Sequence, residues 1–148
     1  MPAYFVDSSA LVKRYRYEAG TERVAELLDL AEALIVARLT QVEVSSAIVR
    51  RGRATSRSTQ EITQIPATFD RNLQESFDVV ELDALVFDRA IEVTRKHGLR
   101  AADAIQLACA IVARGDAPGR ELTVLASDQE LLAAAEAEGL SILDPTRR

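Results

Sequence analysis

The sequence predicts an α/β fold in which a central, mainly parallel sheet is flanked by helices. Short apolar runs alternate with longer segments whose apolar residues recur every three or four positions. Parallel strands need helical crossovers between them, and this alternation supplies those crossovers. The 148 residues show no linker rich in Pro, Gly or Ser and no shift in composition, so we expect a single domain over residues 1–148.

In the first half of the chain, strands and helices are expected in alternation. An apolar strand ends at Asp7, and a helix follows in which Thr21 can cap the first turn. A second apolar strand leads into a helix that closes at Gly52. The predicted elements are a strand over 3–6, a helix over 21–31, a strand over 34–37 and a helix over 40–52.

The second half repeats the alternation after an irregular stretch. Residues 55–76 are polar and contain Pro66, which predicts two helical pieces or one bent helix that moves or contacts a partner. Gly98 and Gly139 follow helical segments and mark their ends. The remaining predicted elements are strands over 77–82, 122–125 and 141–143, and helices over 84–97, 102–114 and 129–138.

The composition is that of an ordinary folded domain. Hydrophobic residues make up 48% and charged residues 28%, and no apolar run approaches the length of a membrane span or a signal peptide, so we expect the protein to stay in the cytoplasm. The single cysteine, Cys109, lies among apolar residues and is expected to pack as a small hydrophobe. His97 precedes Gly98 and is interpreted as a helix C-terminal residue rather than a base.

The net charge of −5 argues against a large, uniformly basic surface for nucleic acid. A local basic surface is still compatible with this charge. A surplus of carboxylates can also belong to a site that becomes neutral only when a metal binds, so the charge alone leaves the class of partner open.

Four acidic residues carry the functional prediction. Asp7 and Asp128 follow predicted strands, whereas Glu43 and Asp103 lie within apolar stretches of predicted helices. A charge in an apolar setting needs a partner, and no lysine or arginine lies three or four residues after Asp103. A hard cation with oxygen ligands would serve several carboxylates together.

Each of these carboxylates also has a local interpretation. Thr40 with Glu43, and Ser127 with Glu130, have the spacing of a capping box, in which the acidic side chain returns to its own helix start. Asp7 and Asp103 lie near predicted helix starts, where the helix dipole stabilises a negative charge. Capping and metal binding are compatible if the helix starts point into one crevice.

Four segments in order and spacing resemble PIN-domain proteins, particularly the VapC toxins of bacterial toxin–antitoxin pairs. Residues 7–13 read Asp-Ser-Ser-Ala-Leu-Val-Lys, like the family's opening Asp-x-Ser-Ala-Leu-Val-Lys. The segment 40–44 is similar to the helix that bears the family's glutamate, 99–108 to its Asp-Ala-x-x-Leu-Ala helix, and 125–128 to its last strand-to-aspartate step. Ala126 departs from the pattern, because many relatives have Thr there; Ser127 or Ser9 would have to supply that hydroxyl.

The resemblance implies a PIN-like α/β/α sandwich and an endoribonuclease that leaves a 5′-phosphate and a 3′-hydroxyl. It implies Mg²⁺ or Mn²⁺ held by Asp7, Glu43, Asp103 and Asp128, where the cation lowers the pKa of a water and offsets charge in the transition state. It also implies a VapB-type antitoxin, whose tail covers the site, and a homodimer.

Two basic clusters lie next to site-bearing segments and are candidates for RNA phosphate contact, although such runs are also typical of solvated faces. The first follows the Asp7 motif and comprises Lys13, Arg14 and Arg16. The second follows the Glu43 helix and comprises Arg50, Arg51, Arg53 and Arg57.

Three rival functions can be compared with the sequence. A receiver-type module needs adjacent acidic residues at the first strand, and an Asp-x-Asp phosphatase needs a carboxylate at position 9; the chain has Ser8 and Ser9. A PIN-like domain that only binds RNA or serves as an assembly scaffold keeps the fold without the reaction. The presence of all four acidic residues favours activity.

Overall fold

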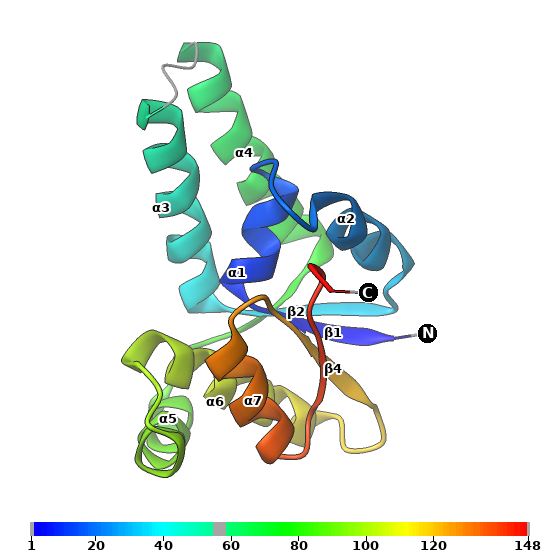
Figure 1. Ribbon diagram of the computed structural model, residues 1–148, viewed down its shortest axis with the longest axis vertical. Coiled ribbons are helices and arrows are strands. Elements are labelled where there is room, and N and C mark those ends of the chain that lie inside the picture. The colour runs from blue at the N-terminus through cyan, green and yellow to red at the C-terminus, as the bar shows by residue number, and fades with distance from the viewer. Residues whose placement is uncertain (1, 55–58, 148) are drawn as a thin grey trace.

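The computed structural model describes residues 2–54 and 59–147, which contain a five-stranded sheet with helices on both faces (Figure 1). Every neighbouring pair of strands is parallel, and the order across the sheet is β3-β2-β1-β4-β5. The predicted α/β fold with a parallel sheet is therefore confirmed. The strands are β1 (Ala3–Val6), β2 (Ala33–Ala37), β3 (Asp78–Val80), β4 (Leu122–Leu125) and β5 (Ser141–Leu143).

The helices form two layers. One face of the sheet carries α1 (Ser8–Leu11), a 3₁₀ turn (Val12–Arg14), α2 (Thr21–Leu30), α3 (Arg38–Ala54) and α4 (Thr59–Ser76). The other face carries α5 (Ala84–His97), α6 (Ala101–Asp116) and α7 (Gln129–Ala137). Within the described chain no helix combines the length and apolar character needed to cross a membrane.

Alternation along the strands separates two hydrophobic cores. In β1, Phe5 packs with the α5–α7 layer, whereas Tyr4 and Val6 pack with the α1–α4 layer. Successive side chains of a strand point to opposite faces, so a strand covered on both sides reads as a continuous apolar run. The bounds of β1 and β4 therefore match those predicted from the sequence.

Several element boundaries differ from the sequence prediction. The strand predicted over 77–82 spans only Asp78–Val80, because β3 is an edge strand and its partner β2 ends at Ala37. The α3 helix begins at Arg38 rather than at residue 40, and the start of α2 is preceded by Gly20 in a left-handed conformation, so Thr21 is not the cap.

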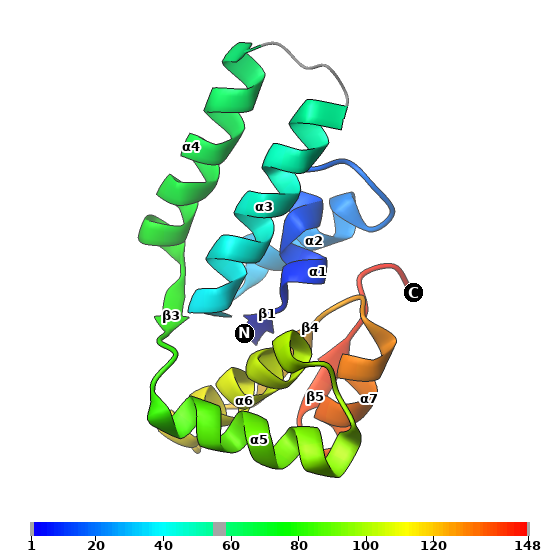
Figure 2. The ribbon, with the colours of Figure 1, turned by 90° about the vertical axis from the view of Figure 1, so that its left-hand side faces the viewer.

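The segment around Pro66 forms one continuous helix, α4, rather than two pieces. Helices α3 and α4 lie side by side and extend beyond the sheet (Figures 1 and 2). Phe69 and Leu73, which follow the proline, are buried against Ile48 and the rest of this core. Packing of this apolar face stabilises the helix despite the missing backbone donor at Pro66.

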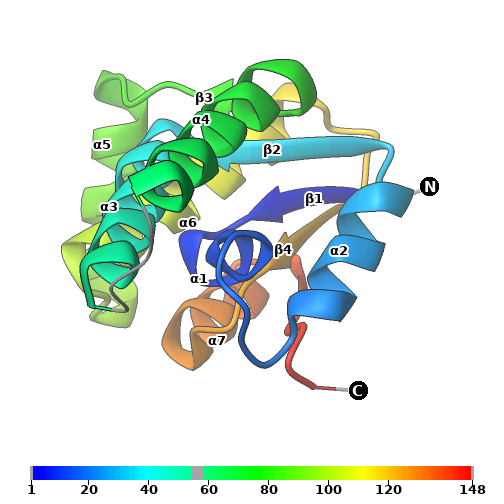
Figure 3. The same cartoon turned by 90° about the horizontal axis from the view of Figure 1, so that it is seen from above.

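The direction in which strands are added reverses at β1, so a ligand site is expected beyond the carboxyl ends of β1 and β4. The chain adds strands on one side of β1 as far as β3, and then crosses to β4 and β5 on the other side. Figure 3 shows β1 between β2 and β4, and Figure 2 faces the edge at which these strands end. In open parallel sheets, ligands bind at such a reversal of strand order.

Candidate active site at the carboxyl edge of the sheet

Asp7 lies at the centre of this edge. It follows β1 directly, its backbone N–H donates to the carbonyl of Leu125 at 2.9 Å, and it is only 4% exposed. Its Oδ2 accepts hydrogen bonds from the backbone N–H of Ser9 at 3.1 Å and from the Ser9 hydroxyl at 2.5 Å. Burial raises the pKa of Asp7 to about 6, the bonds from Ser9 oppose this rise, and the charges of Glu43 and Asp103 add to it.

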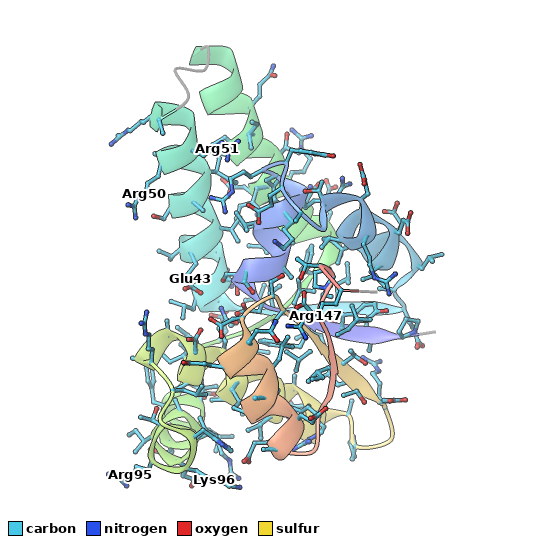
Figure 4. All side chains as sticks on the ribbon, in the orientation of Figure 1. Glu43, Arg50, Arg51, Arg95, Lys96 and Arg147 are labelled. Carbon is cyan, nitrogen blue, oxygen red and sulfur yellow. The ribbon has the colours of Figure 1, made fainter. Side chains whose placement is uncertain are left out.

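Glu43 reaches the same edge from the first turns of α3, as Figure 4 shows. Its Oε1 accepts hydrogen bonds from the Ser8 hydroxyl at 2.7 Å and from Nε2 of Gln106 at 2.9 Å. The alternative interpretation of Thr40 and Glu43 as a capping box is wrong, because α3 begins at Arg38 and the carboxylate of Glu43 faces other helices.

Asp103 and Asp128 line a pocket of about 310 Å³ together with Arg100, Gln129 and Glu130. Asp103 lies in the first turn of α6. Burial raises its pKa, and the negative charges of Asp128, Glu43 and Glu130 raise it further, whereas Arg100 lowers it. Asp128 caps α7 by accepting a hydrogen bond from the backbone N–H of Leu131 at 3.0 Å. The capping residue here is therefore Asp128 and not Ser127.

Carboxylates from four separate segments are thus linked by charge repulsion at one edge of the sheet: Glu43 and Asp103 act on Asp7, and Glu43 and Asp128 act on Asp103. Their oxygen donors suit a hard divalent cation, and a cation would relieve the repulsion that raises the pKa values of Asp7 and Asp103. Among the described residues, no three His, Cys, Asp or Glu side chains are already grouped closely enough to hold a metal ion. The carboxylates therefore fit such a cation in donor type and charge, and they would have to move closer to ligate it together.

The Ser9 hydroxyl connects the segment after β1 with the loop after β4. Its Oγ donates to Asp7 and accepts a hydrogen bond from the backbone N–H of Ser127 at 2.9 Å, so it connects the ends of β1 and β4. Ala126 is fully buried in the core. The Ser127 hydroxyl is buried and has no hydrogen-bond partner within residues 2–54 and 59–147.

Sequence reasoning missed several polar residues of this edge, above all Gln106. It lies three residues after Asp103 and is buried on α6. The signal was a lone amide within the apolar run from Ala104 to Ala113. Ser8, Thr40 and Arg100 were missed as well, because they show no such contrast with their neighbours.

The basic clusters have different surroundings. The RNA contact predicted for Lys13 is not supported, because Lys13 is buried and its ammonium donates to Glu18 at 2.8 Å. Arg16 also pairs with Glu18, whereas Arg14 is exposed. Arg50 and Arg53 are exposed and Arg51 is half-buried, and Figure 4 shows Arg50 and Arg51 farther along α3 than Glu43. Arg57 lies outside the described residues.

The surroundings of Cys109 and His97 indicate structural roles for both residues. Cys109 is fully buried in α6, and burial raises the pKa of its thiol to about 12, so no nucleophilic thiolate forms near neutral pH. His97 ends α5, and its Nε2 lies 2.7 Å from Oε2 of Glu138 after α7. This contact ties the ends of two helices together.

The fold and the acidic edge define a member of the PIN-domain family: the chain belongs to it, and the model of the PIN domain matches residues 4–143. Within the family, the chain is 34% identical to Ribonuclease VapC45 of Mycobacterium tuberculosis, over 98% of this chain and 100% of the relative. It is 35% identical to Ribonuclease VapC35 of the same organism, over 95% and 96% of the two chains. A toxin–antitoxin complex from Klebsiella pneumoniae has a chain of the same fold, with a TM-score of 0.67, 15% identity and 97% coverage of each chain.

Proposed function

We propose that this chain is a VapC-type endoribonuclease that hydrolyses RNA phosphodiester bonds with the help of Mg²⁺ or Mn²⁺. The observation that carries the proposal is the set of four carboxylates at the strand-order reversal, in which the charges of Glu43 and Asp103 act on Asp7 and those of Glu43 and Asp128 act on Asp103. Asp7 is buried and has a raised pKa. Similarity to ribonucleases over nearly the whole chain supports the choice of RNA as substrate. The proposed ligands are Asp7, Glu43, Asp103 and Asp128.

A divalent cation, when bound, supplies a water of lowered pKa and offsets charge that develops on the phosphate. The chain's own groups orient the reaction. Ser9 holds the Asp7 carboxylate, and the cap at Leu131 holds one oxygen of Asp128. Arg100 is exposed at the pocket that it lines with Asp103 and Asp128, which supports a role for its guanidinium in binding an RNA phosphate.

A homodimer and a VapB-type antitoxin are the proposed partners. Similarity to a chain of a toxin–antitoxin complex supports an antitoxin, and the exposed apolar side chains of Val42, Leu85, Phe87 and Ile91 offer surface for a partner. Light scattering is expected to give about twice the chain mass of 16.2 kDa. A mass that stays at the monomer value at all concentrations would contradict the dimer.

Cleavage of a mixed RNA pool tests the activity. The wild type is expected to cleave with Mg²⁺ or Mn²⁺ and to stop when EDTA is added, whereas Asp7→Asn and Asp103→Asn should lose at least about 100-fold in rate. Asp116→Asn, at the far end of α6, is the matched control and should retain full activity. Equal cleavage by all variants would indicate a contaminating nuclease. RNA binding without cleavage by the wild type would indicate the scaffold alternative instead.

A further inference from the structure

Gln106 is a buried amide at the meeting point of three helices. It is 1% exposed, and its neighbours along α6, Ile105 and Leu107, are apolar. A buried amide destabilises a protein unless hydrogen bonds replace those it made to water. Its contacts therefore show what the amide does in this fold.

The amide nitrogen faces a cluster of oxygens. Nε2 lies 2.8 Å from Oγ1 of Thr40, 2.9 Å from Oε1 of Glu43 and 3.1 Å from Oγ of Ser8. The Ser8 hydroxyl in turn donates to the same Oε1 of Glu43 at 2.7 Å. One oxygen of Glu43 thus faces two donors, while its Oε2 makes no hydrogen bond among the described residues.

Glu43 also determines the orientation of the amide. Oε1 of Gln106 is buried and has no hydrogen-bond donor in the described part of the chain. Rotating the amide by 180° would place this oxygen against the carboxylate and remove a charge-assisted hydrogen bond. The observed orientation therefore satisfies the carboxylate at the expense of the amide's own acceptor.

We infer that Gln106 is a positioning residue for Glu43: together with Ser8 it holds Oε1 of Glu43, so that Oε2 of Glu43 stays available to a divalent cation. The inference rests on the proposed function, because it assigns a role to Glu43 as a cation ligand. Partners that orient ligands affect metal affinity by about 10- to 100-fold when they are removed. If Gln106 only joined α1, α3 and α6, its replacement would lower the stability of the fold by the same amount with either Glu or Gln at position 43.

Mn²⁺ binding by variants separates these two roles. Gln106→Met removes the donor at similar volume and is expected to raise the Kd for Mn²⁺, measured by calorimetry, about 10-fold. In a Glu43→Gln background the same substitution should have no further effect on Kd, because Gln106 acts through the carboxylate. Gln74→Met, at an exposed position of α4, is the control and should bind as the wild type does. An unchanged Kd for Gln106→Met, or an equal rise in both backgrounds, would overturn the inference.

A measurement without metal covers the case in which Gln106→Met fails to fold or the wild type binds no Mn²⁺. In the NMR spectrum of the wild type, the side-chain amide protons of Gln106 should exchange slowly and should shift when Glu43 is replaced by Gln. Signals that match an exposed glutamine, or that do not respond to Glu43→Gln, would refute the positioning role. Absence of Mn²⁺ binding by the wild type would instead refute the proposed function, so the two failures are distinguishable.

Discussion

The Ser9 hydroxyl donates a hydrogen bond of 2.5 Å to Oδ2 of Asp7 and also accepts one from the backbone of Ser127. One side chain therefore holds the carboxylate after β1 and the loop after β4 that leads to Asp128. The hydroxyl that bridges these two segments comes from the β1 side, whereas the buried Ala126 at the end of β4 has none.

Ser9→Ala is expected to reduce RNA cleavage about 10- to 100-fold, since Asp7 loses a donor and the Ser127 N–H loses its acceptor. Ser9→Thr keeps the hydroxyl and is expected to retain most of the activity. Cleavage rates at a fixed Mn²⁺ concentration compare the two. Equal rates for Ser9→Ala and Ser9→Thr would show that the hydroxyl is dispensable.

Asp7→Asn is expected to stabilise the metal-free protein at neutral pH. Asp7 has a folded-state pKa of about 6, raised by burial from 3.8, so the folded state binds more protons than the unfolded state between these values. The free energy of unfolding of the wild type therefore falls by up to about 3 kcal/mol as the pH rises from about 4 to about 6. Asparagine stays neutral and is an equally good N-cap.

Denaturation of both proteins in EDTA over pH 4 to pH 8 measures this difference. The variant should be as stable as the wild type near pH 4 and more stable than the wild type at pH 7 and above. Saturating Mn²⁺ should reverse the order, because ligand binding stabilises only the protein that binds it. A variant less stable than the wild type at pH 8 in EDTA would contradict the raised pKa.

Arg100→Gln is expected to weaken RNA binding and to reduce its salt dependence. One lost phosphate contact lowers the slope of log K against log salt by about 0.7 for a single strand. Binding is measured in the Asp7→Asn background in EDTA, so that no cleavage occurs. Arg120→Gln, an exposed position in the loop before β4, is the control. Equal slopes for the two variants would remove Arg100 from the RNA interface.

The double variant Arg50→Gln, Arg53→Gln tests the cluster on α3 separately. Arg50 lies seven residues beyond Glu43, about 10 Å along the helix axis, so any phosphate it binds lies some distance from the site of cleavage. In the same salt titration, the double variant is expected to lower the slope of log K for RNA binding against log salt by about 1.4, because two phosphate contacts are lost. A slope equal to that of the wild type would assign these arginines to a solvated face.

Lys13→Met is expected to destabilise the fold by about 2 kcal/mol, because it leaves Arg16 as the partner of Glu18. The salt dependence of RNA binding should not change. Burial raises the pKa of Glu18, but the hydrogen bonds from Lys13 and Arg16 outweigh it and lower the pKa overall. A lowered carboxyl pKa stabilises the fold above its unfolded value of 4.5 and loses this effect as the pH falls. Urea denaturation should therefore show a larger difference at pH 7 than at pH 3, and equal differences would contradict the ion pair.

Much of the fold was predictable because local patterns report burial. The strands Ala3–Val6, Leu122–Leu125 and Ser141–Leu143 and the helix Ala84–His97 match the prediction to the residue. Their signals are periodicity and helix-ending glycine, which depend only on neighbours in sequence. Predicted element boundaries were wrong where a neighbouring strand sets the length of an element. The length of β3, for example, depends on where β2 ends.

The sequence by itself determined the order of strands and helices and the positions of four acidic residues, since both follow from patterns over a few residues. The tertiary structure decided what those residues contact. Glu43 faces Gln106, 63 positions away, rather than its own helix start, and the Ser9 hydroxyl accepts a hydrogen bond from the backbone of Ser127, 118 positions away. The order β3-β2-β1-β4-β5 brings these groups together. The reason is physical: such contacts arise from the packing of distant segments, which no local periodicity encodes.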